Sequence, residues 1–501
     1  MNTNIYNQKN FFFLTILSIL FTVLFFNDQV AVRGGLVISG EVIYQDNLSP
    51  LKYYFFNSWT LLTQFSALLF KIGLDTQSIS FCLIFLLNLI LFFSCFIIFE
   101  KFIKNTTLSI FLSCLLIFFQ KNLGDTDYPS LIFTIHTFGA FAQALTGLIV
   151  ASLLLNNLKL SFLLGFILFC IHPIVGLWVM LILVFFVFFQ KKIKNLNHFF
   201  KILLPGLLLA MISFSIFYYL SLEKLPYDQN LFNIYIDKWD GHRAITDEVH
   251  YEYLFKSLIL LTIIFYLCPK NNENKLFLSV LGSIIISSII IYLLFKIFHL
   301  NNYQILAPII PGRFMITYTF IAWPVALSLI YYRFRKKKYI DYFFFSLIIL
   351  YSSMHYKTFI NVKDRIVSKD NNLVFLKLKS LENTGNVITS ADLSFNVLYI
   401  SKKPILMSKS LDYLPYHPYL VNKVRDIMTE VYGYDFENPP INNYPYLSDD
   451  FIKSKFEKRP SSDWVKIRNK FKSNFVLTPS SWKLDLKLIY SDKKYNLYSI
   501  I

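Results

Sequence analysis

Residues 80–99, "SFCLIFLLNLILFFSCFIIF", contain no charged side chain. A run of this length matches the roughly 20 apolar residues that an α-helix needs to cross a bilayer. Comparable runs cover 11–26 and 276–297, and 55% of the chain is hydrophobic. The first run follows a short polar start and has no small-residue cleavage site, so it predicts an uncleaved helix rather than a signal peptide. The sequence therefore predicts a polytopic, α-helical membrane protein.

The hydropathy divides the chain into two parts. We expect about eleven membrane segments within a transmembrane domain at 1–356, and a polar domain at 357–501. The predicted segments are 11–26, 80–99, 107–119, 133–155, 160–171, 174–190, 201–221, 254–268, 276–297, 313–332 and 339–356. The segments 107–119, 160–171 and 254–268 are short for a span and could be tilted or re-entrant.

Basic residues predict the orientation. Cytoplasmic connections are enriched in lysine and arginine, and "RFRKKK" at 333–338 is the strongest such cluster. The other predicted inner connections are also basic if 160–190 enters the membrane and returns at His172-Pro173. Among the acids before residue 357, only Glu100, Glu273 and Asp341 then lie inside. We expect a bacterial inner-membrane protein with a cytoplasmic N-terminus and an extracytoplasmic C-terminal domain.

The predicted outer loops carry several short motifs. The first loop, 27–79, contains "GEVIYQ" at 40–45 and the amphipathic stretch "SWTLLTQFSALLFKIGLD" at 58–75, which is expected to lie at the interface. The second loop contains the pair Asp125-x-Asp127. Residues 163–178, "LLGFILFCIHPIVGLW", form two apolar stretches that are interrupted at His172-Pro173.

This layout resembles the GT-C class of membrane glycosyltransferases. The resemblance implies a GT-C-like helical domain and transfer, with inversion, of a sugar from a polyprenyl-phosphate donor. The acceptor would be a glycan, lipid or protein at the outer face, in the cell envelope. It also implies that an acid of the first outer loop serves as the base. The chain has no GxGxxG or P-loop pattern, which fits a lipid donor better than a cytosolic nucleotide sugar.

Glu41 and Asp46 are the candidate catalytic bases. Glu41 and Tyr44 match the E-x-x-Y of some GT-C members, which makes Tyr44 a candidate substrate contact. Gly40 stands where those relatives often have another acid. Solvated loop acids would give the same pattern, so both interpretations stay open.

Asp125 and Asp127 resemble the acidic pair that binds a divalent cation in the oligosaccharyltransferase branch. Carboxylate oxygens suit Mg²⁺, Mn²⁺ or Ca²⁺. The alternative is that Asp127 and Ser130 cap a helix that starts near Pro129.

Further polar residues near the predicted spans are candidate substrate contacts. A guanidinium at a helix mouth suits phosphate, and ionisable groups near spans often mark a site. Interfacial anchoring, packing or a solvated loop would explain the same residues. The candidates are His136, His172, Asp240, His242, Arg243 and Arg313.

The sequence of the C-terminal tail, residues 357–501, predicts an α/β domain. Expected strands are "NVITSA" (386–391), "KPILMS" (403–408) and "NFVLTP" (474–479), followed by a terminal hairpin at 486–500. Helices are expected at 418–433 and 449–471, the second interrupted at Pro460, and the tail has no cysteine.

Other classes of function compete with glycosyl transfer. A transporter or flippase would place ionisable groups at mid-membrane and show a repeat, and the predicted span cores contain no acid. An O-antigen polymerase or ligase would concentrate arginines in a large late loop, whereas 298–312 is short. A non-catalytic scaffold that presents the tail is a third alternative. The charged residues behind the net charge of +17 are distributed unevenly among the predicted loops, so the net charge itself carries little functional weight. We expect no nucleic-acid partner.

Overall fold

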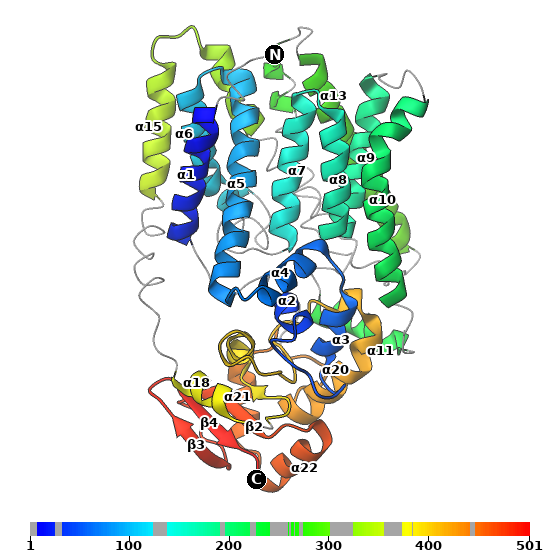
Figure 1. Cartoon of the computed structure of the whole chain (residues 1–501), viewed down its shortest axis with the longest axis vertical. Helices are drawn as coiled ribbons and strands as arrows, with labels where there is room; N and C mark the ends of the chain where they lie inside the picture. Colours follow the sequence, from blue (N-terminus) through cyan, green and yellow to red (C-terminus); the bar gives the residue numbers. More distant parts are fainter. Residues whose placement is uncertain are drawn as a thin grey trace.

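Figure 1 shows the computed structural model of the chain, with a helical bundle at one end and a smaller mixed domain at the other. The structure describes residues 8–25, 33–123, 138–190, 196–220, 227–240, 259, 262–264, 266–269, 274–300, 324–354, 373–382, 384–440 and 446–501.

Long apolar helices stand side by side in the bundle (Figure 1). Two of those in the described residues, α5 and α9, are long and apolar enough to cross a membrane by length and composition. The predicted count of eleven segments is not confirmed by this criterion. The bundle helices are α1 (Gln8–Phe25), α5 (Thr76–Ile103), α6 (Thr106–Leu123), α7 (Phe138–Leu154), α8 (Leu158–Ile171), α9 (Pro173–Gln190), α10 (Leu196–Leu220), α13 (Lys275–Leu300) and α15 (Ile340–Met354).

Helices α8 and α9 form a hairpin that turns at His172, where the sequence predicts it. Proline cannot continue the helix because it lacks the amide hydrogen, and His172 leaves the helical conformation with φ −141° and ψ 89°. The two helices approach each other closely after this turn. A Cβ atom on Gly176 would lie only 2.7 Å from the backbone nitrogen of Phe169. Glycine at this position therefore permits the tight return.

Three short helices lie between the bundle and the C-terminal domain (Figure 1): α2 (Arg33–Ile38), α3 (Pro50–Asn57) and α4 (Leu61–Lys71). A capping side chain precedes two of these helices. Ser49 accepts a hydrogen bond from the amide of Leu51 ahead of α3, and Thr60 accepts one from Thr63 ahead of α4. Glycines let α2 pack against α4, because a Cβ on Gly35 would lie 2.9 Å from Cβ of Ser66.

The described part of the C-terminal domain is built on a four-stranded sheet of order β1-β2-β4-β3. Strand β1 (Ile388–Thr389) pairs in parallel with β2 (Phe475–Pro479), so that Ile388 lies opposite Val476. Strands β3 (Lys487–Ser491) and β4 (Tyr495–Ser499) form the predicted antiparallel hairpin. The longer helices of this domain are α18 (Leu373–Ser380), α20 (Val421–Ile427) continued by η9 (Met428–Tyr432), α21 (Asp449–Glu457) and α22 (Ser461–Phe471).

A second segment of the helical part contacts this domain. Helix α11 (Gln229–Ile234) runs into the π-helical turn η2 (Tyr235–Trp239). The indole nitrogen of buried Trp239 donates to the carbonyl of Phe436 at 2.8 Å, and the Tyr235 hydroxyl donates to the carbonyl of Leu411 at 3.0 Å. The C-terminal domain is therefore held by the first loop and by this segment together.

Candidate functional site

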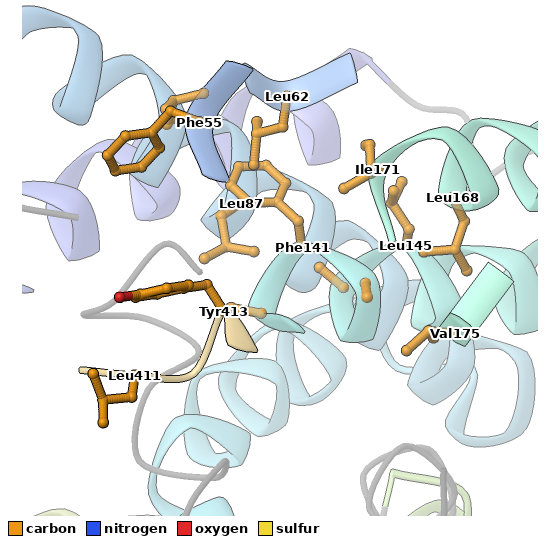
Figure 2. Packing of buried hydrophobic residues seen from close by; sticks show 14 of the residues in the cluster. Phe55, Leu62, Leu87, Phe141, Leu145, Leu168, Ile171, Val175, Leu411 and Tyr413 are labelled. Atoms are coloured by element: carbon orange, nitrogen blue, oxygen red, sulfur yellow. The ribbon is translucent and has the colours of Figure 1, made fainter. Parts of the chain in front are cut away.

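A cavity of about 230 Å³ lies where the bundle, the short helices and the C-terminal domain meet. Both parts of the chain supply apolar and polar side chains to its lining. The lining residues are Arg33, Gly34, Leu51, Tyr54, Phe55, Ser58 and Thr63, then Phe138 at the start of α7, and Phe395, Ser408, Ser410, Asp412 and Tyr413. Figure 2 shows the buried hydrophobic cluster that continues through this junction, with Phe55, Leu87, Phe141 and Tyr413 among its members.

Arg33 supplies a positive charge in a fixed position. Its Nε donates to the Tyr399 hydroxyl at 2.8 Å, and its guanidinium carbon lies 3.3 Å from the centre of the Phe395 ring. These contacts hold the guanidinium plane by cation–π stacking and one hydrogen bond. Within the described part of the chain, its terminal nitrogens make no hydrogen bond, so they can donate to a ligand oxygen.

Asp412 supplies a carboxylate to the same cavity. The side chain is half-buried, and its oxygens take part in no hydrogen bond or ion pair among the described residues. Its backbone amide donates to Ser410 Oγ at 3.2 Å, and Ser408 Oγ donates to the carbonyl of Ser410 at 2.7 Å. The serines thus shape the loop that presents the carboxylate.

Two tyrosines form an aromatic wall. The rings of Tyr54 and Tyr413 stack with centroids 5.3 Å apart and an interplanar angle of 28°. The Tyr413 hydroxyl is buried and has no hydrogen-bond partner among the described residues. Burial raises the pKa of Tyr413, so the phenol stays protonated and able to donate. A buried hydroxyl without a partner at a cavity is a place where a ligand would recover a hydrogen bond.

A chain of four polar side chains reaches the cavity at Ser58. Ser58 Oγ lies 2.7 Å from His417 Nε2, and His417 Nδ1 lies 3.1 Å from the Tyr419 hydroxyl. The Asn57 amide nitrogen donates to that hydroxyl at 2.9 Å. Burial lowers the pKa of His417 to about 4, so the imidazole is neutral at pH 7.

The two predicted base candidates do not line this cavity. Glu41 forms an ion pair with Lys402. Asp46 accepts hydrogen bonds from the Asn386 amide nitrogen and the Leu48 backbone nitrogen, both at 3.0 Å. In the structure both acids attach the first loop to the C-terminal domain.

The other predicted site residues are dispersed. Tyr44 is 6% exposed and packs in the core. His172 ends α8, where its Nδ1 accepts from the Val175 amide at 3.4 Å. Buried Asp240 lies 2.9 Å from the Tyr235 hydroxyl, which shares its one hydrogen between this carboxylate and the Leu411 carbonyl. Neither His172 nor Asp240 lines the cavity.

The remaining predicted residues lie outside the described residues: Asp125, Asp127, His136, His242, Arg243 and Arg313. The predicted cation site therefore stays a prediction. In the part of the chain that the structure describes, no three His, Cys, Asp or Glu side chains gather as a metal site would.

Sequence reasoning did not select Arg33, Ser58, Asp412 or His417. Arg33 directly precedes Gly34 and Gly35 in the predicted first outer loop, and that position could have drawn attention to it. Asp412 and His417 belong to a tail whose sequence shows no motif, so their proximity to the first loop appears only in three dimensions.

No family model and no curated protein matches this chain. Among solved structures, the chain is similar to ArnT from Cupriavidus metallidurans bound to undecaprenyl phosphate. The two chains are 10% identical, the alignment covers 98% of this chain and 97% of that chain, and the TM-score is 0.40. At that TM-score we base neither the fold nor the function on the similarity.

Proposed function

We propose that this protein is a membrane glycosyltransferase that moves a sugar from a polyprenyl-phosphate donor to a glycan, lipid or protein acceptor at the outer face of the bacterial inner membrane. The observation that supports the proposal is the cavity between the bundle and the C-terminal domain. Its lining combines a fixed guanidinium, a carboxylate, serine hydroxyls and stacked tyrosines. This is the chemistry that a phosphate joined to a sugar requires.

The position of the cavity suits a lipid-linked donor. Such a donor keeps its prenyl chain in the bilayer and its head group at the surface. Leu51, Phe55 and Phe138 give the cavity apolar walls, whereas Arg33, Ser58 and Asp412 give it polar groups for a head group. The head group would lie between Arg33 and the loop that carries Asp412.

The proposed reaction is a direct displacement. An acceptor hydroxyl oxygen attacks the anomeric carbon and forms the new glycosidic bond. The bond between that carbon and the phosphate oxygen breaks, its electron pair leaves with the polyprenyl phosphate, and the configuration inverts. Arg33 stabilises the negative charge on the departing phosphate, and a carboxylate accepts the proton from the acceptor.

We propose Asp412 as the carboxylate that accepts this proton. Of the acids in the described residues, it is the one that lines the cavity, and its oxygens are not engaged there. Glu41 and Asp46 stay alternatives from the sequence, but each is already bound to the C-terminal domain. A divalent cation held by Asp125 and Asp127 would add positive charge at the phosphate, and a chelator tests that addition.

Binding of undecaprenyl phosphate by the purified protein in lipid nanodiscs tests the proposal. We expect saturable binding that the alcohol undecaprenol does not reproduce, because Arg33 recognises phosphate. Arg33→Ala should weaken binding at least about tenfold, as expected when a hydrogen bond to a charged group is lost. The matched control is Arg335→Ala, which removes another stacked guanidinium, 4.1 Å from the Tyr332 ring, that does not line the cavity. Equal binding of phosphate and alcohol would reject the proposal.

A further inference from the structure

The hydrogen-bond chain at Ser58 crosses from the C-terminal domain to the first loop. Its middle members, His417 and Tyr419, belong to the C-terminal domain, and its ends, Asn57 and Ser58, belong to the first loop. His417 is 5% exposed, with Tyr54 and Tyr419 packed edge-on against its ring at centroid distances of 5.6 Å. Ser58 is the member that lines the cavity.

The hydrogen-bond chain can run in two directions, which differ in the hydroxyl whose hydrogen is left over. The Asn57 amide nitrogen can only donate, so the Tyr419 oxygen accepts that bond. If the Tyr419 hydrogen then points to His417 Nδ1, the imidazole carries its hydrogen on Nε2 and donates it to Ser58 Oγ. The opposite tautomer makes the same number of hydrogen bonds but leaves the Tyr419 hydrogen over instead of the Ser58 hydrogen. The direction that leaves the spare hydrogen at the cavity, where a ligand oxygen can accept it, runs Asn57, Tyr419, His417, Ser58.

This direction decides what Ser58 can do. Its oxygen is occupied as an acceptor by His417, and its own hydrogen is left to point to the cavity. Arg33 also offers only donors there. Two donors at one cavity suit a ligand with oxygen lone pairs, and an ionised phosphate oxygen makes the strongest such bonds.

We infer that His417 is a positioning residue which fixes the Ser58 hydroxyl as a hydrogen-bond donor to a phosphate oxygen of the ligand. The identity of that ligand as a lipid-linked phosphate rests on the proposed function. The C-terminal domain thereby supplies the group that orients Ser58 of the first loop.

The tautomer can be measured without any ligand. In the full-length protein labelled with ¹⁵N-histidine, nitrogen chemical shifts and couplings separate the two neutral tautomers, and the signal of His417 is identified by its loss in His417→Gln. We expect the hydrogen on Nε2 at pH 7. A hydrogen on Nδ1 would overturn the inference whatever the protein binds.

Binding measurements test the second half of the inference, that Ser58 donates to a phosphate oxygen of the ligand. Ser58→Ala should weaken undecaprenyl phosphate binding about tenfold to a hundredfold, the range for a hydrogen bond to a charged group. His417→Leu should weaken it similarly, and Ser58→Ala should add little in that background because the two residues act as one unit. His417→Gln keeps an amide donor near the place of Nε2 and should restore most of the binding. Tyr490→Phe, which removes a hydroxyl from β3, is the control, and thermal melts verify that each variant folds.

The outcomes separate this inference from the proposed function. Tight binding by the wild type that Ser58→Ala leaves unchanged would overturn the inference and leave the proposed function standing. No binding by the wild type would reject the proposed function and the ligand half of the inference, while the tautomer measurement still decides the hydrogen-bond direction. Inorganic phosphate that competes as strongly as the lipid would show that the site takes free phosphate.

Discussion

Arg33 and Asp412 bring opposite charges to one cavity from the first loop and from the C-terminal domain. The two predicted base candidates have different environments. Glu41 and Asp46 are tied to Lys402 and Asn386, and these contacts join two parts of the chain. A general base must have an oxygen available for the acceptor hydroxyl. These environments therefore favour Asp412 as the residue that accepts the proton.

Asp412→Asn should lower the rate of glycosyl transfer about 10²- to 10⁴-fold, the usual loss for a general base, while undecaprenyl phosphate binding stays near the wild-type value. Asp392→Asn is the matched control, because this carboxylate pairs with Lys409 and does not line the cavity. The measurement is the initial rate with radiolabelled polyprenyl-linked sugar in membranes. If Asp412→Asn keeps full activity and Glu41→Gln or Asp46→Asn abolishes it, the sequence-predicted bases are the right ones.

Acid should destabilise the protein through His417. Its pKa is about 4 in the folded protein and about 6.5 when unfolded, so between these values the unfolded chain binds more protons. The free energy of unfolding should therefore fall as the pH is lowered from 6.5 to 4, by an amount on the order of a few kcal/mol, and be unaffected by this group above 6.5.

Thermal midpoints of the wild type and His417→Gln, compared at pH 7.5 and pH 5, isolate this contribution. The wild type should lose more than the variant on acidification. Equal losses would mean that His417 is not held neutral by burial.

At the scale of elements, the close packing of α2 on α4 positions Arg33 at the cavity. A methyl group on Gly35 would meet Ser66, so Gly35→Ala should destabilise the protein by about 1–3 kcal/mol, the usual cost of overpacking. Gly282→Ala in α13 is the control, because its Cβ would have an ordinary 3.8 Å contact with Phe189. Thermal midpoints should separate the two variants, and equal midpoints would mean that α2 can shift away from α4 without loss.

Elements with strong local signals were predicted well. The helix break at Pro460, the turn at His172-Pro173 and the terminal hairpin all appear where proline or alternation of side chains indicated them. The expected strand "KPILMS" is reduced to an isolated parallel bridge between Val387 and Ile405, because strand length depends on pairing partners that a local pattern does not specify.

The candidate site was predicted less completely than the fold. The sequence analysis singled out the first loop for Glu41, Asp46 and Tyr44, whereas the residues that this loop supplies to the cavity include Arg33, Tyr54 and Ser58. Its partners Asp412 and His417 are more than 300 residues away in the chain. Nothing in the local sequence indicates such long-range contacts, so the domain that completes the cavity could not be recognised from its own composition.

At the scale of the whole molecule, the C-terminal domain is placed at one end of the bundle (Figure 1). The distribution of basic residues predicts that this end is extracytoplasmic and that the "RFRKKK" cluster is cytoplasmic. In a background without native cysteines, Arg425→Cys should react with a membrane-impermeant thiol reagent in intact spheroplasts, and Lys337→Cys should react only after lysis. The reverse labelling would place the cavity in the cytoplasm, away from an outward lipid-linked donor.

The central claim is that the cavity between bundle and C-terminal domain holds the phosphate of a polyprenyl lipid. The most direct measurement is an electron cryomicroscopy structure of the full-length protein in nanodiscs with undecaprenyl phosphate. We predict phosphate density within hydrogen-bonding distance of Arg33 and Ser58, with the prenyl chain leaving past Phe138 at the start of α7. An empty cavity in the presence of bound lipid phosphate elsewhere on the protein would contradict the account.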